Sequence, residues 1–172
     1  VDGHVADEAL TGARLVDVRV IVVDDHPVFR LGLVALLASL PGIDVVGEAA
    51  DAPSAIGLTH RLRPDVVVMD LDLGGTSGIY ATREITRDVP DTGVLVISMH
   101  DDDESLFASM RCGARGYLLK DAGPGEVERA ERAVANGEVL LGSSLASRAL
   151  AFMQGTRRAG TPFPELTDRE RE

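Results

Sequence analysis

Short apolar runs alternate with amphipathic segments along most of the chain. Five runs have the length of a strand and are rich in Val, Ile and Leu, and they lie at Val18–Val23, Ile43–Val46, Asp65–Met69, Val94–Ile97 and Tyr117–Leu119. Apolar runs of this kind are typical of strands that are buried on both faces, as in a parallel sheet. We therefore predict five central strands.

A segment with helical periodicity follows each predicted strand. Two of these segments open with Pro27 and Pro53, and proline suits the first turn of a helix because the N–H that it lacks would have no partner there. The five helices are expected at about 27–40, 53–63, 79–87, 103–112 and 125–136. The predicted apolar face of the first helix consists of Val28, Leu31, Val34 and Leu37.

Strands that alternate with helices predict an α/β fold, in which helices cover both faces of a five-stranded parallel sheet. The expected topology is flavodoxin-like and doubly wound, with a ligand site at the carboxyl ends of the strands. We expect a flexible N-terminal segment over residues 1–17, a folded domain over 18–137, and a linker over 138–164 with one helix at Ser144–Met153. Residues 165–172 resemble the start of a further domain, with Thr and Glu spaced as in a capping box.

Polar side chains end four of the five predicted strands. Asp24 and Asp25 follow the first strand, Asp70 the third, Ser98 the fourth and Lys120 the fifth. Because all strands of a parallel sheet point the same way, these side chains should converge at one edge. Three neighbouring carboxylates repel one another, and a hard divalent cation together with one ammonium group would offset that charge. Mg²⁺ suits such a site because it prefers oxygen ligands.

This set of groups matches the needs of phosphoryl transfer, in which catalysis consists mostly of positioning and charge neutralisation. Asp70 is the candidate nucleophile and would form an acyl phosphate. Lys120 would pair with the phosphoryl group, and Ser98 would donate a hydrogen bond to one of its oxygens. The candidate Mg²⁺ ligands are Asp24, Asp25, Asp70 and the backbone carbonyl of Asp72.

Each of these residues also has a simpler structural interpretation. Asp24 and Asp25 could cap the helix that follows them, Ser98 could be a turn residue, and Lys120 could be an exposed charge at a strand end. Asp70 is harder to explain in this way, because a half-buried carboxylate costs free energy unless it is paired. Lys120 is the sole lysine among 17 Lys and Arg residues, which indicates a specific need for an ammonium group.

Composition narrows the functional classes. The formal net charge of −11 argues against this chain holding nucleic acid by itself, because phosphate contacts need a basic face. Cys112 is the only cysteine, so a disulfide framework is excluded and a reduced, cytoplasmic setting is expected. His26 and His100 flank the predicted site without the His and Cys spacing of a zinc site. No apolar run is long enough to cross a bilayer, so we expect no membrane partner.

Five motifs occur in order along the chain: VVDDHPVFRLGL at 22–33, PDVVVMD at 64–70, VLVIS at 94–98, GYLLKD at 116–121 and LTDRERE at 166–172. With this set the chain resembles the CheY-like receiver domain of bacterial two-component response regulators, specifically the NarL/LuxR group of transcription factors. The last motif resembles the opening of that group's helix-turn-helix domain, of which the chain would hold only the start. One departure is Gly74-Gly75, where the family usually has Pro-Gly, and this pair would loosen the loop after Asp70.

The resemblance implies that a sensor histidine kinase phosphorylates Asp70 with the help of Mg²⁺. It also implies that Tyr117 is the aromatic switch residue, whose ring turns inward when Ser98 moves toward the phosphoryl group. From its strand position alone, Tyr117 would usually be a core residue. The responding surface would control homodimerisation or the release of a DNA-binding domain. DNA would therefore be bound through that C-terminal domain, and we expect no DNA binding by residues 1–172 alone.

Three other functions stay open. A phosphatase of the haloacid-dehalogenase type also uses a nucleophilic Asp, and Asp72 would be its general acid/base; however, Gly74 stands where that signature has Thr or Val, and the acidic pair here precedes the nucleophile. A receiver is not a turnover enzyme, because it labels itself once and then hydrolyses slowly. A receiver-like interaction module would lack Asp25, Asp70 or Lys120, and all three are present. A stand-alone receiver would need neither the linker nor the final motif.

Overall fold

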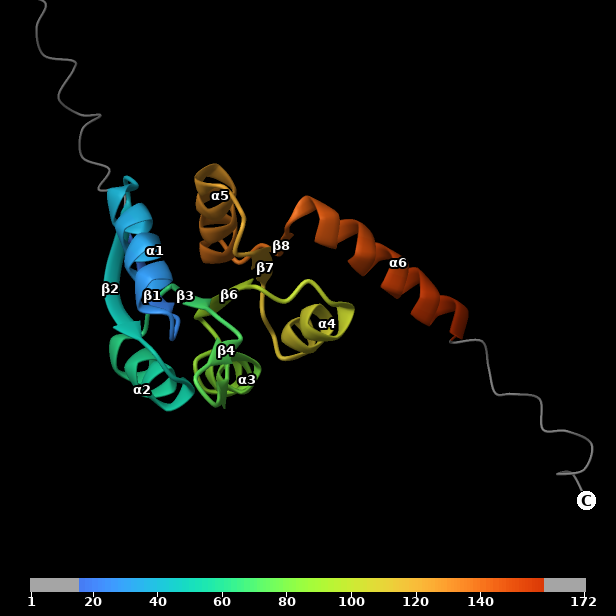
Figure 1. Ribbon diagram of the computed structural model, residues 1–172, viewed down its shortest axis with the longest axis horizontal. Helices are drawn as coiled ribbons and strands as arrows, with labels where there is room; N and C mark the ends of the chain where they lie inside the picture. The colour runs from blue at the N-terminus through green and yellow to red at the C-terminus, as the bar shows by residue number, and fades with distance from the viewer. Residues whose placement is uncertain (1–15, 160–172) are drawn as a thin grey trace, which may run out of the picture.

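A sheet of parallel strands forms the centre of the protein, and helices cover both of its faces (Figure 1). The structure is a computed structural model that describes residues 16–159. Within these residues the strand order is β2-β1-β3-β6-β7-β8, and every neighbouring pair is parallel. The strands are β1 (Val18–Val23), β2 (Ile43–Ala49), β3 (Val66–Met69), β6 (Gly93–Ser98), β7 (Gly116–Leu119) and β8 (Leu140–Leu141).

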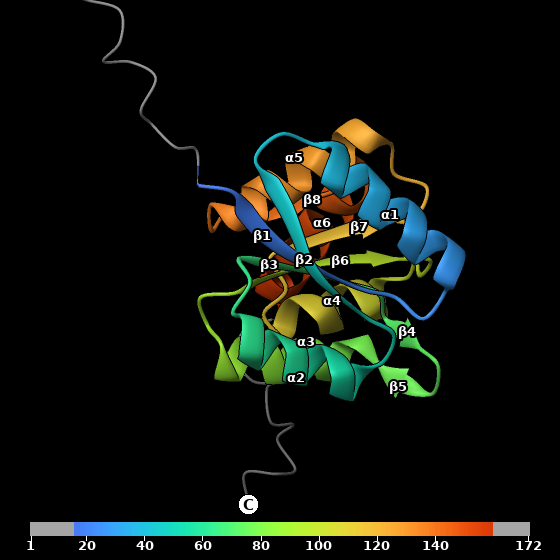
Figure 2. The ribbon, with the colours of Figure 1, turned by 90° about the vertical axis from the view of Figure 1, so that its left-hand side faces the viewer.

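Helices α1 and α5 lie on one face of the sheet, and α2, α3 and α4 lie on the other (Figure 2). Helix α6 continues from β8 past α4 and away from the sheet (Figure 1). The helices are α1 (Pro27–Ser39), α2 (Ala52–Leu62), α3 (Gly78–Asp88), α4 (Asp103–Arg111), α5 (Pro124–Ala135) and α6 (Ser143–Ala159). None of the helices within residues 16–159 is long and apolar enough to cross a lipid bilayer.

Alternate residues of each central strand face opposite layers of helices. In β1, Ile21 and Val23 belong to the core shared with α2 and α3, whereas Val20 and Val22 belong to the core shared with α1 and α5. All four side chains are buried, and full burial of such a side chain stabilises a fold by about 1.5–3 kcal/mol. The central strands are therefore apolar on both faces, and polar side chains are displaced to the strand ends.

The five predicted strands and the five predicted helices are all present. The sheet also gains a sixth strand, β8, which pairs with β7 and corrects the predicted number of five. The apolar pattern does not indicate β8, because two residues are too few to show a period. Most of the predicted N-terminal segment and the predicted domain start at 165–172 lie outside the described residues.

The apolar face predicted for α1 is wrong in part. Leu37 is buried as expected, but the exposed fractions of Val28 and Leu31 are 85% and 70%, and Leu33 faces the core instead. Residues 27–40 are apolar almost all round the helix, so periodicity alone does not select the face that packs on the sheet. Packing against β1 and β2 leaves Val28 and Leu31 on the surface.

A tight hairpin replaces the glycine-rich loop that was expected after Asp70. Strands β4 (Asp72–Leu73) and β5 (Thr76–Ser77) pair in antiparallel fashion across Gly74 and Gly75. Both glycines have positive φ, 56° and 92°, and a two-residue hairpin turn with two positive φ angles favours glycine. The Gly-Gly pair therefore supports a defined turn, contrary to the expectation that it loosens this segment.

One buried charge in α5 lacks a partner. Glu131 is fully buried, and neither of its carboxylate oxygens has a hydrogen-bond partner within the described residues. Burial raises the pKa of Glu131 to about 7; the charge of Arg132 opposes this shift, and those of Asp65 and Glu128 add to it. The folded protein therefore binds this proton more tightly than the unfolded chain does.

Replacement of Glu131 by Met should stabilise the protein, and more so at high pH. The cost of a buried, unpaired acceptor is about 1–3 kcal/mol, and we expect Glu131→Met to raise the free energy of unfolding by this amount at about pH 8. The gain should shrink toward about pH 5, where Glu131 is protonated in the folded wild type. This protonation stabilises the folded wild type at low pH, and the stabilisation is lost as pH rises through the folded pKa. Urea unfolding at both pH values checks this, with the exposed Glu138→Met as control. Equal gains at both pH values would contradict the assignment.

Candidate functional site

The carboxyl ends of β1, β3, β6 and β7 meet at one edge of the sheet. The backbone N–H of Asp70 donates to the carbonyl of Val23 (2.9 Å), and the backbone N–H of Lys120 donates to the carbonyl of Ser98 (2.9 Å). These hydrogen bonds continue the strand ladders just beyond the strands. The backbone positions of Asp70 and Lys120 are thereby tied to the rigid centre of the fold.

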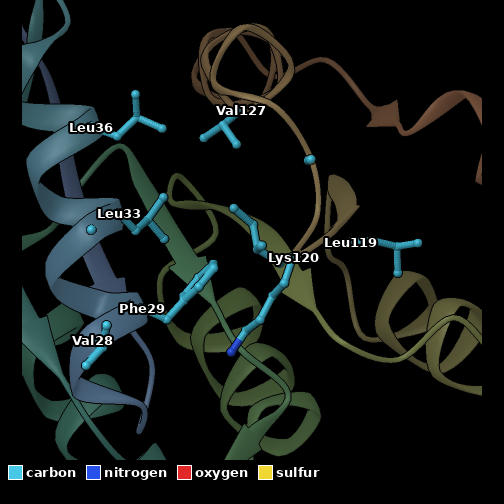
Figure 3. Close-up of a pocket in the computed structure, with 10 residues that line it drawn as sticks. Val28, Phe29, Leu33, Leu36, Leu119, Lys120 and Val127 are labelled. Atoms are coloured by element: carbon cyan, nitrogen blue, oxygen red, sulfur yellow. The ribbon is translucent and has the colours of Figure 1, made fainter.

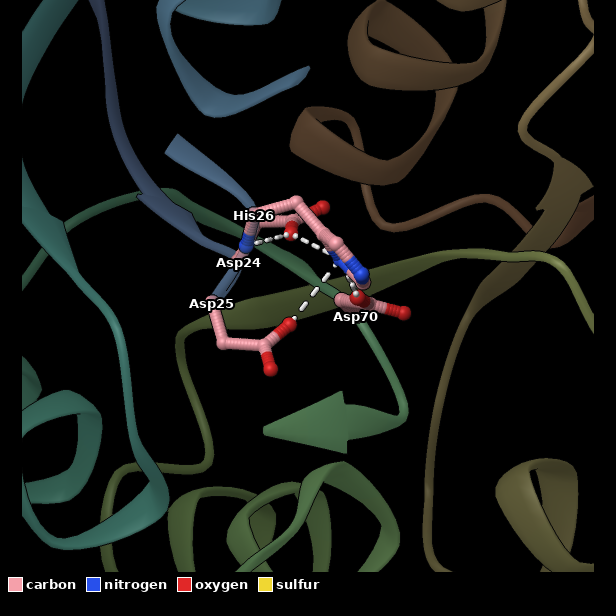
Figure 4. A group of neighbouring side chains, drawn as sticks. All are labelled: Asp24, Asp25, His26 and Asp70. Atoms are coloured by element: carbon pink, nitrogen blue, oxygen red, sulfur yellow. Dashed lines mark hydrogen bonds and ion pairs between the residues drawn. The ribbon is translucent and has the colours of Figure 1, made fainter. Parts of the chain in front are cut away.

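Four side chains form what we call the acid pocket: Asp24, Asp25, His26 and Asp70 (Figure 4). One potential ligand atom from each lies within 4.8 Å of the others. Asp24 and Asp70 are only 2% and 3% exposed, whereas Asp25 lies nearer the surface. The Nδ1 atom of His26 lies 3.2 Å from Asp24 Oδ1, 3.0 Å from Asp25 Oδ1 and 3.8 Å from Asp70 Oδ2. His26, which sequence reasoning placed only beside the site, therefore points into it.

The two acids after β1 do not cap α1. The residue at the N-cap position is His26, and its side chain makes no capping hydrogen bond. Asp24 Oδ1 instead accepts a hydrogen bond from the backbone N–H of His26 at 2.7 Å. The capping interpretation of Asp24 and Asp25 is therefore wrong.

The ammonium group of Lys120 joins two buried carboxylates. Its Nζ lies 2.9 Å from Asp24 Oδ2 and 3.0 Å from Asp70 Oδ2, and 4.4 Å from the centre of the Phe29 ring, a distance at which a cation is attracted to the ring face. Burial lowers the pKa of Lys120, but the hydrogen bonds and charges of Asp24 and Asp70 outweigh burial and raise it. Lys120 is thus a buried cation, and the alternative of an exposed charge at a strand end is wrong.

The carboxyl group of Asp70 is held in an environment that disfavours its charge. Burial raises the pKa of Asp70; the hydrogen bond from Lys120 opposes the shift, and the charge of Asp24 adds to it. The single ammonium group of Lys120 therefore does not offset burial and the charge of Asp24 together.

The acid pocket fits a hard divalent cation. Asp25 Oδ1 is shielded from solvent and has no hydrogen-bond partner in the described part of the chain, although His26 Nδ1 lies 3.0 Å away. A buried, unpaired carboxylate oxygen is costly. Carboxylate oxygens are also the ligands that Mg²⁺ prefers, so a bound cation of this class would both neutralise the site and satisfy Asp25.

Ser98 and Tyr117 are buried at the same edge and contact the segment that follows β6. The hydroxyl oxygen of Ser98 accepts a hydrogen bond from the backbone N–H of His100 (3.0 Å), and the hydroxyl group of Tyr117 donates to the carbonyl of His100 (2.8 Å). Burial raises the pKa of Tyr117 to about 12, and a hydrogen bond with Ser98 opposes the shift. The ring of Tyr117 lies in the core, a position that suits both a core residue and an inward-turned switch residue.

Asp72 faces away from the acid pocket. Its carboxylate pairs with the Nε2 of His100 at 2.7 Å, and its backbone N–H lies 3.5 Å from Asp70 Oδ1. Only the backbone of Asp72 is thus placed next to Asp70. Its carbonyl as a metal ligand stays a prediction.

Gly78 is a site residue that the sequence pattern does not identify. A Cβ atom built on this glycine would lie 2.0 Å from the backbone carbonyl oxygen of Asp70 and 2.7 Å from the Cα of Leu71. The start of α3 therefore packs directly on the backbone of Asp70. A glycine at the first position of the helix was the available signal.

A groove of about 350 Å³ lies beside the acid pocket, between α1 and the start of α5 (Figure 3). Its walls are mostly apolar and include Val28, Phe29, Leu33, Leu36 and Val127. Lys120 lines the groove and also contacts Asp70. A molecule bound in the groove would therefore lie next to the acid pocket.

The sequence profile of the response regulator receiver domain matches residues 20–131. The chain belongs to this family. Its relatives include the transcriptional regulatory protein LiaR of Bacillus subtilis, 37% identical over 90% of this chain and 74% of the relative. The transcriptional activator DevR/DosR of Mycobacterium tuberculosis is 38% identical over 90% of this chain and 71% of the relative.

Solved structures give the same result. A LuxR-family response regulator from Aurantimonas is 37% identical, with a TM-score of 0.73 over 76% of this chain and 94% of that one. The receiver domain of NarL from Mycobacterium tuberculosis is 36% identical, with a TM-score of 0.68 over 71% and 98%. This protein is a two-component response regulator of the NarL/LuxR type, and its relatives are transcription regulators rather than typical enzymes.

Replacement of Gly78 by Ala should damage both the fold and the site. The added methyl group would overlap the Asp70 carbonyl, so we expect unfolding to become easier by about 1–3 kcal/mol, as for overpacking in a core. Gly57→Ala is the matched control, because Gly57 lies in α2 with open space around its Cα, and there alanine should stabilise by about 0.5–1 kcal/mol. Urea unfolding measures both changes. A neutral Gly78→Ala would contradict the close contact with Asp70.

Proposed function

We propose that this response regulator is switched by phosphorylation of Asp70. An Asp70 oxygen attacks phosphorus, the bond between phosphorus and the donor breaks, and the donor leaves with that electron pair, so that an acyl phosphate forms. The donor in the cell is a phosphohistidine of a sensor histidine kinase. The observation that carries this proposal is the Lys120 ammonium group 3.0 Å from the buried Asp70 carboxylate.

The acids around Asp70 would hold Mg²⁺. Its ligands are the carboxylates of Asp24, Asp25 and Asp70 and the carbonyl of Asp72. Asp25 Oδ1 supports this set, because it is shielded from solvent and has no hydrogen bond within the described residues, with His26 Nδ1 3.0 Å away. When bound, the ion neutralises charge on the phosphoryl oxygens and on the acids. Lys120 holds a further phosphoryl oxygen by its charge, and this position needs an ammonium group because the space between Asp24 and Asp70 suits a compact cation.

Ser98 and Tyr117 would report the phosphoryl group to the rest of the domain. The Ser98 hydroxyl group turns from His100 toward the phosphoryl oxygens. The Tyr117 ring is already inward, so Tyr117 would respond through the hydrogen bond of its hydroxyl group to the His100 carbonyl. Such a change is a local electrostatic event that biases a surface with two states. The output is transcription control through a C-terminal DNA-binding domain, with homodimerisation as one means of control.

The groove beside the acid pocket would receive the kinase. Val28 lies on its rim and is exposed, and Leu31 of the same helix is exposed as well. Exposed apolar side chains that gather on one surface mark a protein contact. A partner that delivers a phosphohistidine to Asp70 must approach past this rim, because Lys120 lines the groove and also binds Asp70.

Incubation with Mg²⁺ and acetyl phosphate should add one phosphoryl group to the chain. Intact-mass measurement should show the increment in the wild type and in Asp72→Asn, whose side chain faces His100, and no increment in Asp70→Asn. Lys120→Arg should label at least tenfold more slowly, because the bulkier guanidinium group does not fit between the two acids.

The same variants separate this function from a haloacid-dehalogenase-type phosphatase. In that enzyme Asp72 would be the general acid/base, so Asp72→Asn would abolish turnover of a phosphate ester. We expect no steady turnover by the wild type. An increment that persists in Asp70→Asn would show that the acceptor is another residue.

Val28→Asp should slow phosphotransfer from a histidine kinase without affecting the chemistry at Asp70. With an autophosphorylated kinase that labels the wild type, transfer should fall by about tenfold, because a charge is introduced into an apolar contact. Labelling by acetyl phosphate should be unchanged. Val139→Asp is the matched control, since Val139 is also an exposed valine but is not among the residues that line the groove. Equal loss with both donors would contradict a docking role.

A further inference from the structure

Helix α6 contacts the rest of the receiver domain well beyond β8, the strand that precedes it. Near its start, Leu145 is fully buried in the core on the α4 side of the sheet. One turn further, Arg148 reaches Asp101 and Asp103, which precede and begin α4. Its guanidinium group binds the side chain of Asp101, the carbonyl of Asp101 at 3.0 Å and the side chain of Asp103 at 2.7 Å.

A ring contact continues this attachment along the helix. Phe107 of α4 and Phe152 of α6 stack with their ring centres 3.8 Å apart. The arginine contacts and the ring stack lie along adjacent turns of the same two helices, which run past one another in Figure 1. We call Arg148 with Asp101 and Asp103 the α6 clamp. Beyond the clamp, α6 leads toward the C-terminal part of the chain.

The clamp holds the loop that contacts the predicted switch residues. Residues 99–102, which we call the β6–α4 loop, join Ser98 to α4. Within this loop, the backbone N–H of His100 donates a hydrogen bond to Ser98, and its carbonyl accepts one from Tyr117. The Nε2 atom of His100 pairs with the carboxylate of Asp72. Asp101 is the next residue. A chain of contacts therefore leads from Asp70 through Lys120 and Ser98 to His100. His100 adjoins Asp101, which binds Arg148.

The strength of the clamp suits a switch. Its carboxylates are exposed and Arg148 is partly exposed, and exposed ion pairs contribute little free energy each. The two-carboxylate grip of Arg148 makes the clamp more specific than a single surface pair. A contact of this kind holds one state by a small margin, so a small displacement of its carboxylates changes the balance.

We propose that the α6 clamp couples the phosphorylation site to the C-terminal part of the chain: Arg148 holds α6 while Asp70 is unmodified, and movement of the β6–α4 loop releases it. The proposal rests on the proposed function of Asp70. The Ser98 hydroxyl oxygen accepts from the N–H of His100, and the side-chain rotation that brings this oxygen to the phosphoryl group takes it away from that N–H. The loop then shifts, Asp101 moves with it, and Arg148 loses part of its grip.

Hydrogen exchange of the α6 amides tests the clamp. The 172-residue chain is measured alone and with Mg²⁺ and beryllofluoride, a non-covalent mimic of the phosphoryl group. In the wild type, beryllofluoride should speed exchange over residues 146–155 by about fivefold to tenfold. Arg148→Ala should show this faster exchange without beryllofluoride and little further change with it.

Matched variants separate the clamp from a general loss of structure. Asp101→Asn with Asp103→Asn should reproduce the effect of Arg148→Ala, and Arg148→Lys should restore part of the protection because it keeps the charge. Arg129→Ala removes another exposed arginine, on α5, and should leave α6 unchanged. Exchange in β1 and β3 should stay as in the wild type in every variant.

Three results would overturn the proposal. The first is Arg148→Ala with wild-type exchange in α6, which would mean that the clamp holds nothing. The second is a wild-type α6 that ignores beryllofluoride although acetyl phosphate labels Asp70, which would make the contact static. The third is failure of Asp70 to accept a phosphoryl group, which refutes both the proposed function and the release step. The exchange of Arg148→Ala without ligand shows separately whether Arg148 holds α6.

Discussion

The position of one ammonium group organises the functional end of this protein. Lys120 follows β7 and reaches two acids that follow β1 and β3, so three strands of the sheet are tied together at their carboxyl ends by charge. Phe29 of α1 packs on the same group. The site is therefore rigid before any ligand arrives, because the sheet and a helix both fix its central cation. Preorganised charge of this kind avoids the cost of reorientation during phosphoryl transfer.

The order of elements and the position of the acids followed from the sequence for a physical reason. Strands buried on both faces must be apolar throughout, so Asp70 at the end of such a run marks the edge of the sheet, and parallel direction then places Asp24, Ser98 and Lys120 at the same edge. No tertiary detail is needed for this placement. In α1, by contrast, apolar side chains surround the helix, so the hydrophobic pattern does not select the face that packs on the sheet, and Val28 is exposed.

The contacts that sequence reasoning missed depend on how loops turn. His26 and His100 lie next to acids in the folded chain, yet the sequence says only that they are near strand ends, and the direction of an imidazole ring is set by the turn. In the sequence Gly78 indicates only a loop, whereas in the structure the start of α3 packs directly on the Asp70 backbone at this glycine. Glu131 shows the opposite case, since its place on a charged helix predicts exposure and packing buries it.

The hydrogen bond from Tyr117 to the His100 carbonyl gives the protein a built-in optical probe. The chain has two tyrosines and no tryptophan; Tyr80 is exposed on α3, and Tyr117 is sealed in the core. Tyrosine absorbance and emission respond to solvent and to hydrogen bonding of the phenol. In a variant that lacks the Tyr80 ring, tyrosine spectral changes come from Tyr117 alone. They therefore report on the loop before α4, in unlabelled protein and in real time.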